Sequence, residues 1–271
     1  MLGVEKLKSN HDAQVEARVI GAQLALLSGE RKIDQARALI EEAGKHVTQL
    51  RDTSRTAGEF HYWKYQLARA TKDYATTVQE AEWIVKNRPR QEYVQAALIT
   101  LALDVERKLK SAQDEEKGKL QKQAYDLYRE LSDAMGTTEE ILKSKKNAAI
   151  AATRLAKYAS LVGKHSEATK ILETLVKIHS RDARYIRMLA LAQFQAKNFD
   201  RALELWRRLV NGLKKESNGW YEAKLYGIAS LAELEKSEAL KEFNQYKLLR
   251  PNLGPPAWRE QFKELGKKLS R

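Results

Sequence analysis

The stretch NFDRALELW, residues 198–206, places Ala202 four residues before Trp206. Thirty-four residues earlier the chain reads KHSEATKIL, residues 164–172, and Ala168 again stands four residues before a large apolar side chain. The same arrangement at a fixed interval predicts a repeated structural unit, because self-similarity with a period of 20 to 50 residues is typical of helical arrays and other repeat architectures.

Each unit also carries a second small residue, 12 positions before the first. The third unit, which contains KSEALKEF at residues 236–243, keeps this internal spacing but is shifted by three residues after the polar run NGLKKESNG. The paired small residues of the three units are Ala156 and Ala168, Ala190 and Ala202, and Gly227 and Ala239.

The periodicity of apolar residues predicts an all-α protein. Apolar positions recur every three or four residues, as in ALLSGERKIDQARALI, residues 25–40, which places them on one face of a helix. Pro and Gly are few, at 4 and 13 of 271 residues, and no convincing strand pattern with a period of two occurs.

The small residues have a physical role in this pattern. Two antiparallel helices joined by a short turn approach closely only where both side chains are small. Bulky residues at Leu172, Trp206 and Phe243 then fill the space toward the next unit. Because one helix pair leaves an apolar face uncovered, the units are expected to stack.

The pattern resembles the tetratricopeptide repeat, a helix–turn–helix unit of about 34 residues. Residues 183–216 supply its characteristic positions with Ile186, Leu189, Ala190, Phe199, Ala202 and Trp206, and the unit from Trp220 ends at Pro251. The N-terminal half matches less well, since Tyr65 and Thr77 stand where the repeat has small residues.

The resemblance implies a right-handed α-α superhelix of about six helix pairs. We expect degenerate pairs over residues 1–136, three closer matches over 137–254 and a C-terminal capping helix over 255–271. The spacer at residues 111–119 is predicted to be a turn, and Thr137-Thr138-Glu139-Glu140 to begin a helix with a hydroxyl cap and early acids.

The net charge of +13 lies almost entirely in one half of the chain. Residues 1–136 hold 22 basic and 21 acidic residues, whereas residues 137–271 hold 27 and 15. A basic half attracts acidic peptides, nucleic acid or anionic lipid, although Lys and Arg also simply keep helix surfaces soluble.

No catalytic or cofactor motif is present. The chain lacks Cys, its five His show no metal-ligand spacing, and no nucleophile elbow or glycine-rich phosphate loop occurs. We therefore expect no enzymatic activity, no metal and no cofactor. The apolar runs are too short for a signal peptide or a membrane span.

In the family that the chain resembles, the first helix of each pair lines a peptide-binding groove. The matching positions form a basic stripe with aromatic side chains, which predicts binding of an acidic or partly apolar protein segment. The candidates are Thr153, Lys157 and Ser160 in one unit, Arg184, Arg187, Leu191 and Phe194 in the next, and Tyr221, Lys224 and Ile228 in the third.

Among these candidates, Arg184, Arg187 and Lys224 are expected to converge on one concave surface. The carboxylate clamp of the family's chaperone-tail binders needs Asn where Lys157, Leu191 and Ile228 stand, so that specificity is not expected.

Two alternatives remain open. The basic half could bind nucleic acid or another polyanion, or the array could be an architectural spacer that self-associates. The absence of Cys does not fix the compartment, and among the open possibilities we favour a cytoplasmic location. Because its charge pattern begins at Met1, we also expect a piece of a longer protein, which would leave a periplasmic or exported location open.

Overall fold

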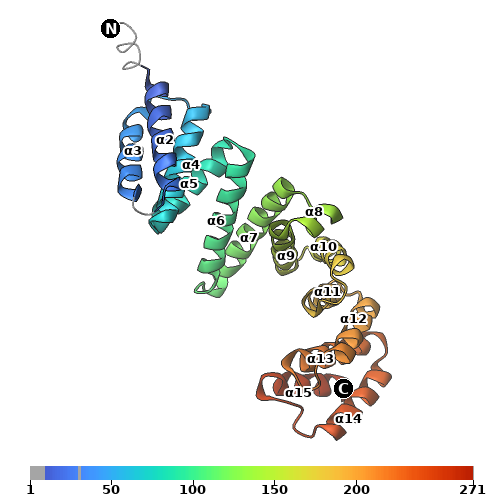
Figure 1. Ribbon diagram of the computed structural model, residues 1–271. Coiled ribbons are helices and arrows are strands. Elements are labelled where there is room, and N and C mark those ends of the chain that lie inside the picture. Colours follow the sequence, from blue (N-terminus) through green and yellow to red (C-terminus); the bar gives the residue numbers. More distant parts are fainter. Residues whose placement is uncertain (1–9, 30–31, 271) are drawn as a thin grey trace, which may run out of the picture. The chain divides into compact units, whose positions relative to one another are not determined.

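The computed structural model describes residues 10–29 and 32–270 (Figure 1). These residues form fourteen helices, α2 to α15, and no strand. The predicted all-α class is therefore confirmed. The first nine residues, MLGVEKLKS, which the prediction of no signal peptide concerns, lie outside the described residues.

The chain divides into two compact units, Met1–Met135 and Gly136–Arg271. In the first unit, α2 packs on α3, α4 on α5 and α6 on α7, so that three helix pairs follow one another. The helices are α2 (His11–Leu27), α3 (Ile33–Val47), α4 (Arg55–Ala70), α5 (Tyr74–Asn87), α6 (Gln91–Leu109) and α7 (Asp114–Met135).

The second unit begins with a short helix and continues with three helix pairs and a final helix. The helices are α8 (Glu139–Ser144), α9 (Lys146–Leu161), α10 (His165–Ile178), α11 (Ala183–Gln195), α12 (Phe199–Gly212), α13 (Asn218–Leu234), α14 (Lys236–Leu249) and α15 (Pro256–Ser270). Six helix pairs in the described residues agree with the predicted number.

The small residues of the repeat are buried, as expected if they lie between packed helices. The five alanines at these positions are fully buried, and so is the Trp206 side chain. Bulky Phe243 packs toward the final helix, because a Cβ built on Gly266 of α15 would lie only 2.6 Å from the Phe243 ring. Pro251 follows α14 in an exposed turn. The fully buried alanines are Ala156, Ala168, Ala190, Ala202 and Ala239.

The helix pair α4/α5, which departs from the repeat pattern, accommodates its larger residues in another way. Tyr65 is buried, and its hydroxyl donates to the Ala96 carbonyl and bonds with the Thr100 hydroxyl on α6. The Thr77 hydroxyl donates to the carbonyl of Asp73. Tyr65 thus connects α4 to α6 by hydrogen bonds, whereas the Thr77 hydroxyl bonds within the first turn of its own helix, α5.

Most helix boundaries follow from local chemistry. Thr138 caps α8, and its hydroxyl accepts from the amide of Ile141, as predicted. The turn predicted at residues 111–119 is shorter than expected, because α7 already begins at Asp114. The acids at 114–116 are compatible with a first helical turn, where negative charge is stabilised by the helix dipole.

Candidate functional site

Two predicted binding residues lie on exposed parts of α9 and α11, each the first helix of its pair. Lys157 on α9 is exposed, with its ammonium 4.8 Å from the centre of the Tyr158 ring. Arg184, at the start of α11, has 83% of its side chain exposed and pairs with Asp182 at 2.6 Å. The guanidinium holds the pKa of Asp182 below its ordinary value, chiefly by a side-chain hydrogen bond.

Repeat symmetry relates exposed residues on α9 and α11. A shift of 34 residues superposes Ala156 on Ala190, and the same shift relates Ile150 to Arg184 and Lys157 to Leu191. Ile150 is 49% exposed, Leu191 is half-buried, and the two helices contact each other. We call Ile150, Lys157, Arg184 and Leu191 the α9/α11 surface.

Arg187 links the first helices of two neighbouring repeats through an ion pair. Its Nε and Nη2 donate to the two carboxylate oxygens of Glu222 on α13, at 2.5 and 2.7 Å. The Glu222 carboxylate is nearly buried, and its hydrogen bonds raise the pKa of Arg187. The pair connects α11 to α13, so Arg187 has a structural role that the sequence did not reveal.

Lys224 points elsewhere, which corrects the expectation that the three basic residues converge. Its ammonium bonds with Glu242 on α14 at 2.6 Å, whereas Glu222, two residues earlier on α13, faces Arg187. Two residues along a helix are rotated by about 200°. Lys224 therefore points away from the side of α13 on which Glu222 bonds with Arg187 of α11.

Two further candidates belong to the core. Tyr221 is 7% exposed and Ile228 is fully buried, and both pack in the cluster formed by α13, α14 and α15. The family positions do not transfer to α13, because its packing against α15 covers this face. Phe194 is half-buried and meets Phe199 and Tyr226 edge to face, with ring centres 5.5 and 5.3 Å apart.

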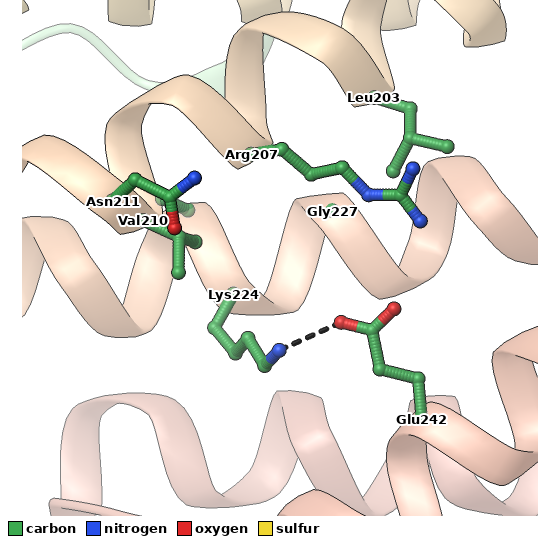
Figure 2. A pocket seen from close by; sticks show the side chains of 8 residues that line it. Leu203, Arg207, Val210, Asn211, Lys224, Gly227 and Glu242 are labelled. Carbon is green, nitrogen blue, oxygen red and sulfur yellow. Dashed lines mark hydrogen bonds and ion pairs between the residues drawn. The ribbon is translucent and has the colours of Figure 1, made fainter.

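A cavity of about 250 Å³, not anticipated from the sequence, lies between α12 and α14 with α13 as its floor (Figure 2). Leu203, Arg207, Val210 and Asn211 of α12 form one wall. Glu242 of α14 forms the other, bonded to Lys224 on the floor. Its residues come from three helices, so no local motif marks them.

A second cavity of about 540 Å³ shares Arg207, Lys224 and Glu242 with the first and continues along α14. Its further residues include Leu231, Glu235, Glu238 and Lys241. We call the two cavities together the α12/α14 groove.

In the described part of the chain, no three His, Cys, Asp or Glu side chains approach closely enough to hold a metal ion. Within residues 10–29 and 32–270, no helix combines the length and apolar character needed to cross a membrane.

The described residues form an array of helix pairs. No protein-family profile matches the chain, and no curated protein matches its sequence. Among solved structures, the chain is similar to that of pilF from Pseudomonas aeruginosa, with 13% identity and a TM-score of 0.41 over 96% of this chain and 100% of that one.

Two further structures are similar at comparable identity. A thermophilic tetratricopeptide repeat protein of Thermus thermophilus, TTC0263, is 15% identical with a TM-score of 0.33, covering 80% of this chain and 98% of that one. Acl4, described as the assembly chaperone of RpL4, is 13% identical with a TM-score of 0.29, covering 94% and 95%.

Proposed function

We propose that this protein is a non-enzymatic scaffold for protein–protein interaction, and that its α9/α11 surface binds an acidic, partly apolar segment of a partner. The supporting observation is that cations and apolar side chains alternate at equivalent positions on two adjoining helices: Ile150 is equivalent to Arg184, and Lys157 is equivalent to the half-buried Leu191. A ligand with carboxylates and apolar side chains complements both kinds of contact.

The cations of this surface are available to a partner. Arg184 is bonded to Asp182, only two residues away, and 83% of the Arg184 side chain but only 25% of the Asp182 side chain is exposed. Exposed ion pairs contribute little stability, because water and salt screen them. A partner's carboxylate therefore replaces Asp182 at small cost, and the Lys157 ammonium lies over the ring of Tyr158.

The mixed character of the surface favours a protein ligand over nucleic acid. Binding of a nucleic-acid backbone relies on several cations that neutralise successive phosphates, and it weakens steeply with salt. Here the apolar residues interrupt the cations, and Arg187 and Lys224 are already paired with carboxylates.

Selection from a library of random 12-residue peptides, displayed on phage and offered to the whole chain, tests the proposal. We expect selected sequences to be enriched in Asp and Glu interspersed with apolar residues, and their affinity to fall only modestly between low and physiological salt. Enrichment of basic or purely apolar peptides would overturn the proposal. Tighter, steeply salt-dependent binding of a single-stranded oligonucleotide would favour the polyanion alternative.

A further inference from the structure

We propose that the α12/α14 groove holds a single carboxylate side chain of an extended peptide, with Arg207 as the residue that binds it. The groove residues differ from those of the α9/α11 surface, and the inference does not depend on what that surface binds. Four features of the groove support this assignment.

Arg207 has an unoccupied guanidinium directed into a cavity. Its neighbours on α12 are engaged: Arg201 pairs with Glu204, and Arg208 donates to the Ser180 carbonyl. Figure 2 shows the Arg207 side chain extended above Gly227, with no dashed contact to Glu242. No carboxylate in the described part of the chain forms an ion pair with Arg207. Guanidinium groups bind carboxylates through paired parallel hydrogen bonds, so this group suits such a ligand.

The charge balance of the first cavity, where the ligand carboxylate would lie, favours a monoanion. The first cavity contains two cations, Arg207 and Lys224, and one anion, Glu242, which is held by Lys224 at 2.6 Å. One positive charge therefore remains, and a carboxylate matches it. A phosphate monoester carries nearly two negative charges at neutral pH, about one more than the single positive charge of the cavity balances.

Gly227 on the cavity floor is not required by packing. A Cβ built on Gly227 would lie 3.6 Å from the Cβ of Trp206, an ordinary contact distance, and the equivalent positions in the other two units are alanines. Glycine within a helix is destabilising relative to alanine. Because Gly227 has no side chain, the cavity is larger than it would be with alanine at this position. The size of the cavity is therefore a reason for glycine here, whereas packing is not.

The walls of the groove favour a peptide over a free small acid. Leu203 and Val210 offer apolar contact to the stem of a ligand side chain. The groove then continues along α14 past Leu231 toward Glu235 and Glu238, far beyond the size of one side chain. An extended peptide would fill both parts, with its carboxylate at Arg207 and a basic or polar residue toward Glu235.

The experiment uses isotope-labelled full-length protein and four probes in separate NMR titrations. The probes are the capped peptide acetyl-Leu-Glu-Ala-Lys-amide, its Gln counterpart, free glutarate and inorganic phosphate. We expect the Glu peptide to shift the Arg207 Nε–H signal and the Gly227 amide signal saturably, the Gln peptide to bind roughly tenfold more weakly, and glutarate and phosphate to bind more weakly than the Glu peptide.

Two substitutions on α12 test whether the peptide carboxylate binds to Arg207 in particular. Arg207→Gln should weaken binding of the Glu peptide roughly tenfold, or about 1.4 kcal/mol. Arg208→Gln removes the same charge from the next residue, outside the cavities, and should leave the affinity unchanged. Equal losses in the two variants, or retained binding by Arg207→Gln, would overturn the proposal. Equal affinity for phosphate or free glutarate would overturn its assignment to a peptide carboxylate.

Discussion

Gly227 packs directly against Trp206 across the α12–α13 contact, yet the contact has room for one more carbon atom. Gly266 of α15 is different, since a Cβ at that position would lie 2.6 Å from the ring of Phe243. Two helical glycines in one unit thus differ in whether packing requires them, and this difference is directly testable.

Gly227→Ala should stabilise the protein by about 1 kcal/mol, because it removes the conformational cost of glycine within a helix. Gly266→Ala should destabilise it by roughly 1–3 kcal/mol, because the Phe243 ring must move. Urea denaturation followed by circular dichroism measures both. Equal effects of the two substitutions would show that the packing around these glycines is described incorrectly. If the α12/α14 groove binds as proposed, Gly227→Ala should also lower its affinity for the Glu peptide.

Arg187→Ala should destabilise the protein by about 2 kcal/mol, because the nearly buried Glu222 carboxylate would lose its bidentate partner. Arg184→Ala is the matched control, since 83% of the Arg184 side chain is exposed, and the unfolding free energy of this variant should be unchanged within error. Hydrogen exchange of the α11 and α13 amides would locate the effect. If exchange in Arg187→Ala were faster only in other helices, the result would contradict a stabilising link between α11 and α13.

The buried carboxylate of Glu80 on α5 should make the α4/α5 pair sensitive to acid. Burial raises its pKa, but hydrogen bonds from His61 and Lys64 on α4 outweigh burial and leave the pKa below its ordinary value of 4.5. The folded state therefore binds fewer protons than the unfolded state. The stabilisation is present above pH 4.5 and is lost as the pH falls through the lowered folded-state pKa.

Glu80→Gln should accordingly cost on the order of 2 kcal/mol at neutral pH. The difference from wild type should shrink as the pH falls below about 4.5. Glu82→Gln, on the same helix but exposed, serves as the control and should behave like wild type. Thermal unfolding between pH 7 and pH 3 measures this, and a difference that does not vary with pH would be contrary to the linkage.

Removal of the final helix should promote self-association. Phe262 and Leu265 of α15 are buried against α13 and α14, so deletion of residues 255–271 would expose an apolar face. Light scattering should report an apparent mass that rises with concentration. An unchanged monomer mass would mean that α15 does not cover an adhesive surface.

The sequence was sufficient to predict the fold because the packing signals are local. The spacing of Ala168, Ala190 and Ala202 marks where helices touch, and the structure buries all three. Thr138 could likewise be recognised as a cap from its neighbours. The repeat pattern predicts helix pairs even for α4/α5, where the larger residues Tyr65 and Thr77 replace the small ones.

The candidate site was less predictable, because it depends on contacts between residues far apart in sequence. Nothing near Arg187 indicates that Glu222, 35 residues later, would pair with it. The family register also failed on α13, where Tyr221 is buried. Arg207 was not recognised, since its cavity forms only when α12, α13 and α14 come together.

The central claim is that the α9/α11 surface binds an acidic, partly apolar segment. The most direct measurement is the affinity of a library-selected acidic peptide for Arg184→Glu, Lys157→Glu and the control Lys170→Glu, an equal charge reversal on the exposed face of α10. The account predicts a loss of roughly tenfold or more for the first two variants and wild-type affinity for the third. Equal affinity across all three variants would contradict it.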